Sequence, residues 1–198
     1  MMADPFGTIV GIIDLLDKAK KAYDKFKDAK GLPKAFGTIS GQIDLATSIF
    51  KDVKDIANHT AQMNKIRGTV DQCEMDAKDL HAIYLLVHEH INDKWHQRYK
   101  SYIANMKDER KCEVEKIWKR ILDGVHLLAA EFGIQKLDEI MSAIKAIDSL
   151  PSSLGDSSAG TVNNTNLGTS GVTGTNLGEV TMGNKYAGAH NEYHGKSP

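Results

Sequence analysis

The apolar residues of the first 150 positions recur at helical spacing, and this pattern constrains the fold more than any other feature. No part of this stretch alternates apolar and polar residues with the period of two that a half-buried strand shows. We therefore predict an all-α bundle of about five to six helices over residues 4–150. The helices are expected over about 4–31, 34–59, 61–90, 92–106, 108–131 and 135–147, with the fourth either separate from the third or continuous with it.

The boundaries of these helices are marked by residues that begin and end helices. Asp4 followed by Pro5 is an acidic N-cap with proline in the first turn. Gly31 suits the left-handed conformation that commonly ends a helix, and the proline two residues later cannot continue the helix. Gly133 is expected to end the fifth helix in the same way. These signals support separate helices joined by short turns.

The composition changes sharply after residue 150. From Gly155 onward, 44 residues contain nine glycines, six asparagines and six threonines. Such a segment cannot bury enough apolar surface to fold as a second globular domain. We therefore predict two parts, a helical bundle over 4–150 and a disordered, amyloid-prone tail over 151–198.

The tail repeats itself. The letters TNLG occur at 165–168 and again at 175–178, and the pattern Asn-x-Tyr-x-Gly occurs twice with a period of seven residues. In a cross-β stack, asparagines form amide ladders and tyrosines stack on one another. The alternative is a disordered linker rich in glycine, asparagine and threonine. The residues of the predicted amyloid motif are Asn166, Gly168, Asn176, Gly178, Gly183, Asn184, Tyr186, Gly188, Asn191, Tyr193 and Gly195.

The first predicted helix carries a strongly apolar face that is a candidate for contact with a membrane. The face is expected to hold Phe6, Ile9, Val10, Ile13 and Leu16. The apolar run is shorter than the roughly 20 residues that span a bilayer. The same helix contains Gly7 and Gly11, which lower helix stability. They indicate either close packing against a neighbouring helix or a helix that leaves the bundle for a lipid interface.

Several other classes of function are not favoured. The net charge of −1 and the pI of about 6.7 argue against a nucleic-acid binder. The histidines of the stretch HEHINDKWH do not have the spacing of a zinc protease, and a solvated helix face explains them better. Cys73 and Cys112 lie within predicted helices and are expected to be free thiols. The sequence therefore predicts neither an enzyme nor a cofactor, and the absence of a secretory signal pattern favours the cytoplasm.

Two segments resemble known proteins. The opening DPFGTIVGIIDLLDKAKKAYDKFKDAKGLPKAF, residues 4–36, resembles the SesA and HeLo-like domains at the N-terminus of fungal NLR-like NACHT and STAND NTPases, with DAKGLPKAF as its most specific part. The tail resembles the RHIM-like amyloid signalling motif of fungal cell-death proteins, Gly-Asn-x-aromatic-x-Gly. Gly183, Asn184, Tyr186 and Gly188 match that motif, whereas His190 replaces the first glycine of the second copy.

The order of these parts resembles the cell-death executioners of the HET-S and HELLP type. The resemblance implies an NLR-like STAND partner with a similar motif, whose fibril nucleus templates this tail into amyloid. It further implies self-association into fibrils, relocation from the cytoplasm to the plasma membrane, and release of the first helix to bind and permeabilise the lipid bilayer. The alternative is a non-lytic helical adaptor with a flexible tail, which leakage of liposomes would distinguish.

Overall fold

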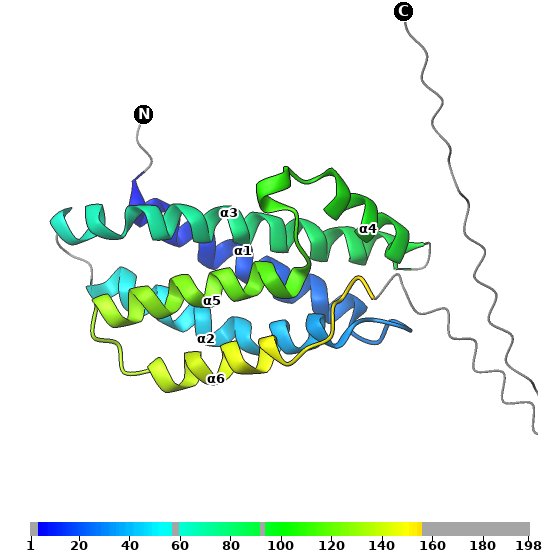
Figure 1. The fold of residues 1–198 in the computed structure, drawn as a ribbon. Coiled ribbons are helices and arrows are strands. Elements are labelled where there is room, and N and C mark those ends of the chain that lie inside the picture. The colour runs from blue at the N-terminus through cyan, green and yellow to red at the C-terminus, as the bar shows by residue number, and fades with distance from the viewer. Residues whose placement is uncertain (1–3, 57–59, 92–93, 156–198) are drawn as a thin grey trace, which may run out of the picture. The chain divides into compact units, whose positions relative to one another are not determined.

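Six α-helices and one short 3-10 helix make up the part of the chain that the computed structural model describes, residues 4–56, 60–91 and 94–155 (Figure 1). No residue in these ranges belongs to a strand, so the predicted all-α bundle is confirmed. The elements are α1 (Pro5–Phe26), α2 (Lys34–Ile56), α3 (Thr60–His90), α4 (Trp95–Asn105), η1 (Asp108–Arg110), α5 (Val114–Glu131) and α6 (Leu137–Asp148).

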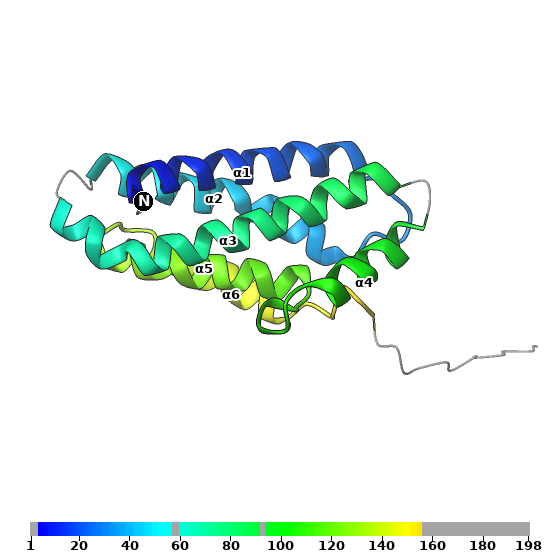
Figure 2. The same ribbon diagram turned by 90° about the horizontal axis from the view of Figure 1, so that it is seen from above.

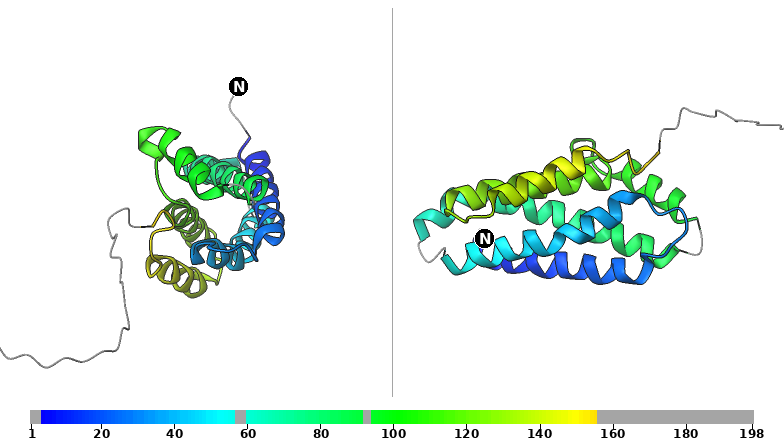
Figure 3. Two further views of the ribbon diagram at one scale, coloured as in Figure 1. Left: turned by 90° about the vertical axis from the view of Figure 1, so that its right-hand side faces the viewer. Right: turned by 90° about the horizontal axis from the view of Figure 1, so that it is seen from below.

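The long helices lie side by side, and α1 lies at an edge of this arrangement (Figure 2). Within the described residues, α1 contacts only α2 and α3, whereas α3 and α2 each also contact α5. Helix α6 packs against α2 and α5, and the short α4 packs against α3. The view along the helices in Figure 3 shows the same edge position of α1. One side of α1 therefore has no neighbouring helix.

The predicted helix boundaries are confirmed where local chemistry decides them. The carboxylate of Asp4 accepts hydrogen bonds from the backbone N–H groups of Phe6 and Gly7, each at 3.2 Å, and so caps α1. Gly133 ends α5 as predicted, with a φ of 65°, whereas Gly31, with a φ of 79°, lies in the turn before α2, five residues after the end of α1 at Phe26. These left-handed conformations suit glycine because it has no Cβ.

One alternative that the sequence left open is resolved, and one predicted boundary is wrong. The fourth helix is separate from the third, because Lys94 takes a left-handed φ of 50° immediately before α4. The fifth helix begins at Val114 rather than near 108, and residues 108–110 form the 3-10 helix η1. The backbone N–H of Val114 donates to the hydroxyl of Tyr99, at 3.0 Å. A tertiary contact from α4 therefore serves the start of α5, which is not visible in the local sequence.

An aromatic cluster fills the core where α1, α2, α3 and α4 meet. The ring centroid of Phe36 lies 5.3–6.2 Å from the ring centroids of Phe26, Tyr84, Trp95 and Tyr99. The hydroxyl of Tyr84 is fully buried and donates to the backbone carbonyl of Phe36, at 3.0 Å. The C-terminal half of α1 is thereby held in the core through Phe26.

The predicted amyloid motif, from Asn166 to Gly195, lies outside the described residues.

Candidate functional site

The candidate membrane-active residues of α1 do not share one environment. Ile9 and Leu16 are completely buried against the bundle, and Ile13 is half-buried. In contrast, Phe6 and Val10 are 41% and 48% exposed. The five residues predicted to form one apolar face are therefore divided between the core and the exposed side of α1. The reason is the edge position of α1, because the helix has apolar residues around more of its circumference than α2 and α3 can cover.

Close packing does not explain the glycines of α1. A Cβ added at Gly7 would lie 3.8 Å from its nearest neighbour, an oxygen of Asp4, and one added at Gly11 would lie 3.8 Å from an oxygen of Glu74. Both distances are ordinary van der Waals contacts, so alanine would fit at either position. Each glycine in a helix interior lowers its stability by about 0.5–1 kcal/mol relative to alanine. The first half of α1, taken as residues 5–16, is thus less stable as a helix without any gain in packing.

The second half of α1 is held in addition by aromatic contacts. Ala19, Ala22 and Phe26 are buried, and the Phe26 ring meets those of Tyr23 and Tyr84 edge-on, with centroids 5.5 and 5.7 Å apart. Such aromatic pairs contribute about 0.5–1.5 kcal/mol beyond the area they bury. The two halves of α1 therefore differ in how the bundle holds them, because the first half packs through aliphatic side chains and contains both glycines, whereas the second half packs through aromatic rings.

A buried ion pair joins α3 to α5 and was not predicted from the sequence. Asp76 has no exposed surface, and its carboxylate accepts hydrogen bonds from Arg120 at 2.6 and 3.0 Å and from the Gln72 side chain at 3.0 Å. Burial alone would lower the pKa of Arg120, but the hydrogen bonds and charge of Asp76 raise it. The guanidinium also donates to the Cys112 sulfur, at 3.1 Å.

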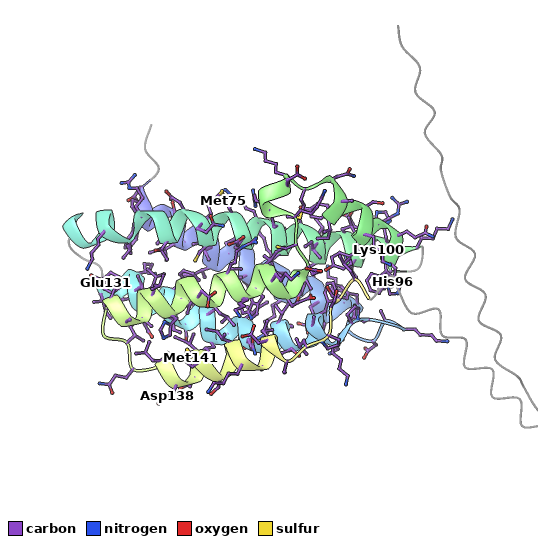
Figure 4. All side chains as sticks on the ribbon, in the orientation of Figure 1. Met75, His96, Lys100, Glu131, Asp138 and Met141 are labelled. Carbon is purple, nitrogen blue, oxygen red and sulfur yellow. The ribbon has the colours of Figure 1, made fainter. Side chains whose placement is uncertain are left out.

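The sequence did contain a signal for this pair. Asp76 lies among Cys73, Ala77 and Leu80 at the spacing of the buried face of α3, where a charged residue needs a buried partner. The network joins α3 to α5, and other helices of the bundle pack against these two. Figure 4 shows the dense side-chain packing between these helices.

The segment that follows α6 is fastened to the bundle. Ser153 is buried, and its hydroxyl lies 2.7 Å from the hydroxyl of Tyr99. Its backbone N–H donates to the carboxylate of Glu115, at 2.8 Å. The last described residues before position 156 are thus tied to α4 and to the first turn of α5.

The candidate metal ligands and thiols of the described residues can be placed individually. In the ranges given above, no group of three histidine, cysteine or acidic residues is placed to hold a metal ion. Cys73 and Cys112 are both free thiols. Burial and the nearby Asp76 raise the pKa of Cys73 to about 12, and burial also raises the pKa of Cys112. Thiolates, the reactive form of cysteine, are therefore disfavoured at both positions.

Comparison with known proteins identifies the family. Residues 9–128, more than half of the 198-residue chain, match the SesA family model, described as the N-terminal domain on NACHT_NTPase and P-loop NTPases. The chain belongs to the SesA family. The matched SesA region runs from the first half of α1 to the last turn of α5, so α6 lies beyond it. No curated protein and no solved structure matches the chain.

Membership of the SesA family confirms the predicted relation to NACHT NLR-like proteins, and it is consistent with a signalling or cell-death module. None of the described helices combines the length and the apolar character needed to cross a bilayer.

Proposed function

We propose that this SesA domain is a non-enzymatic cell-death effector that permeabilises the plasma membrane through the first half of α1. The observation that carries the proposal is the construction of that half-helix. It lies at the edge of the bundle, exposes Phe6 and Val10, and contains two glycines that packing does not require. A helix of this kind is held in the resting protein but is suited to leave it.

The energy of release fits a regulated step. Freeing the first half of α1 removes Ile9, Ile12 and Leu16 from the core, where all three are fully buried. At about 1.5–3 kcal/mol for each large apolar side chain, release is opposed by roughly 5–9 kcal/mol. A single bundle therefore keeps α1 in place. A lipid interface offsets this energy because the same side chains are buried again among the acyl chains.

A trigger that gathers many copies supplies the remaining energy. We propose that an NLR-like STAND partner templates the tail into amyloid through a motif similar to Gly183, Asn184, Tyr186 and Gly188. The assembled bundles then present their α1 helices side by side, so that weak membrane binding by one helix becomes avid. The anchor between Tyr99 and Ser153 keeps each bundle fastened to the segment that leads to the tail. Relocation from the cytoplasm to the plasma membrane follows from this avidity.

The proposed lesion depends on many short insertions. The apolar part of α1 ends near Leu16, after which lysines and aspartates alternate, so it is shorter than the roughly 20 residues that span a bilayer. We therefore propose interfacial insertion or an oligomeric lesion.

The test is a pair of matched substitutions in the full chain, seeded with fibrils of a peptide covering 155–198 and mixed with dye-loaded vesicles. Val10→Asp and Leu127→Asp both place a charge on an exposed apolar site, on α1 and α5 respectively. Val10→Asp should lower the leakage rate at least tenfold, and Leu127→Asp should leave it unchanged, with both variants folded by circular dichroism. Ile9→Asp is unsuitable because Ile9 is fully buried and the charge would unfold the bundle.

Equal leakage from both variants would contradict the role of α1. If the seeded natural chain forms fibrils but causes no leakage, the protein is instead a non-lytic adaptor.

A further inference from the structure

We propose that a basic groove along α4 binds the anionic headgroups of membrane lipids and docks the bundle on the membrane before α1 is released. This inference rests on the proposed membrane function and adds a second, separate contact to it. The groove is defined by six residues with basic side chains: His90, Lys94, Arg98, Lys107, Arg110 and Arg120.

The first observation is an imbalance of charge. Residues 94–107 contain Lys94, Arg98, Lys100 and Lys107 but no aspartate or glutamate, although the whole chain has a net charge of −1. All four are exposed, and none forms an ion pair with another described residue. On α1, in contrast, Lys18, Lys20 and Lys21 each form an ion pair with an aspartate. The positive charge of this stretch is therefore local, and no ion pair within the described residues compensates it.

The second observation is the shape of this surface. A hollow of about 470 Å³ lies between α3 and α4 and is lined by His90, Lys94 and Arg98 together with amide and hydroxyl side chains. A second hollow of about 230 Å³ shares Tyr102 and Asn105 with the first. Its lining includes one carboxylate, Asp79. The shared residues show that the two hollows adjoin.

The groove continues past η1. A third hollow, of about 470 Å³, shares Lys107 and Arg110 with the second and is also lined by Arg120. Arg110 is paired with Asp79, but its buried Nε–H finds no acceptor among the described residues. A buried donor without a partner is unfavourable, and a phosphate oxygen in the groove would satisfy it. The groove thus combines unpaired cations, polar donors and one unused buried donor.

A lipid surface suits this groove better than a protein partner. Stable protein interfaces have an apolar centre, whereas Met75, in the third hollow, is the one exposed large apolar residue among the described residues that line the groove. Basic residues near a membrane surface each contribute about 1 kcal/mol through attraction to anionic lipids.

The proposed docking surface on α4 lies away from the residues of α1 that are proposed to enter the membrane. Helix α4 lies at the end of the bundle opposite the N-terminus of α1 (Figure 2). Lys100 and His96 are labelled at that same end in Figure 4. Docking through α4 therefore keeps Phe6 and Val10 away from the contact, and the resting protein should bind anionic membranes without causing leakage.

The test uses the full chain without seeds, sedimented with phosphatidylcholine vesicles that do or do not contain phosphatidylserine. The natural chain should bind only the phosphatidylserine vesicles, less tightly as the salt concentration rises. Arg98→Gln with Lys107→Gln should weaken binding about 25-fold, at about fivefold for each lost cation. Lys51→Gln with Lys145→Gln removes two exposed lysines from α2 and α6 and should leave binding unchanged. Unchanged melting temperatures would show that both variants fold.

Failure of the natural chain to bind phosphatidylserine vesicles, or equal binding by both double variants, would overturn the proposal. Tighter binding to soluble poly-glutamate than to the vesicles would assign the groove to an acidic protein partner and would also overturn it. The proposed function is tested separately by tethering Arg98→Gln/Lys107→Gln to nickel-bearing vesicles through an added histidine tag. Seeded leakage should then return to the natural level, because tethering replaces docking but leaves α1 intact.

Discussion

Gly124 and Gly11 are both glycines in helix interiors, but their surroundings differ. A Cβ at Gly124 would lie 2.4 Å from the sulfur of Cys73, closer than real atoms approach, whereas one at Gly11 would lie 3.8 Å from the nearest side chain. Gly124→Ala should therefore lower the free energy of unfolding by about 1–3 kcal/mol through overpacking. Gly11→Ala should raise it by about 0.5–1 kcal/mol. Urea unfolding followed by circular dichroism measures both changes.

The same glycine pair also tests the functional account. Gly11→Ala should slow seeded leakage, because a more stable first half of α1 is harder to release. A stabilised variant that leaks as fast as the natural chain would contradict the idea that this half-helix must leave the bundle.

Two buried tyrosines predict a loss of stability at alkaline pH. Burial raises the pKa values of Tyr84 and Tyr99 above the ordinary value of about 10. Below about pH 10 both groups are protonated in the folded and the unfolded chain, so they add no pH dependence. Above it, the unfolded chain loses protons that the folded chain retains. The free energy of unfolding should then fall by about 1.4 kcal/mol per pH unit for each tyrosine.

Urea unfolding from neutral pH to about pH 11, together with tyrosinate absorbance, checks this slope. Tyr84→Phe should lower stability at neutral pH, because it removes the hydrogen bond to Phe36, and should reduce the alkaline slope by about 1.4 kcal/mol per pH unit. Titration of all six tyrosines near pH 10 in the folded protein would contradict the prediction.

At the scale of helices, the pair between Asp76 and Arg120 should hold α3 and α5 together. Asp76→Asn leaves the Arg120 charge partly buried without its partner and should lower the free energy of unfolding by about 3–5 kcal/mol. Asp148→Asn breaks an exposed ion pair with Lys119, between α5 and α6, and should change it by less than about 1 kcal/mol. Thermal and urea unfolding compare the two variants, and losses of equal size would contradict the distinction between buried and exposed pairs.

The helices were predictable from sequence to the extent that local chemistry decides them. The cap at Asp4 follows from the preference of a single residue, so the start of α1 was found, whereas the helix ends at Phe26, five residues before the left-handed Gly31. The start of α5 depends on a hydrogen bond from Val114 to Tyr99, which joins two helices that no local pattern relates. The exposure of Phe6 and Val10 depends on how many neighbours α1 has, and helical spacing alone does not contain that information.

The basic groove shows the same limit. The absence of acidic residues between positions 94 and 107 is visible in the sequence. That these cations adjoin Arg110 and Arg120 depends on the turn at Lys94 and on the 3-10 helix that returns the chain to α3. The local excess of basic residues could therefore be predicted from the sequence, whereas the groove that they form with Arg110 and Arg120 could not.

At the scale of the whole molecule, a core with a buried ion pair and an aromatic cluster is joined to the first half of α1, which exposes Phe6 and Val10 and contains two glycines. We propose that the paired helices α3 and α5 and the aromatic cluster around Phe36 keep the rest of the bundle folded while the first half of α1 leaves. Hydrogen bonds from Ser153 to Tyr99 and Glu115 attach the segment after α6 to the bundle. We expect the bundle to stay folded when the tail assembles.

An environment-sensitive dye on α1 tests this claim most directly, read on the full chain with vesicles before and after seeding with fibrils of the 155–198 peptide. Val10→Cys and Leu127→Cys place the dye at matched exposed sites on α1 and α5. The account predicts that the dye on α1 moves from water into lipid after seeding, with a blue-shifted emission that spin-labelled lipid quenches, whereas the dye on α5 stays in water. A dye on α1 that stays in water while the vesicles leak would contradict the account, because the membrane would then be damaged without contact from α1.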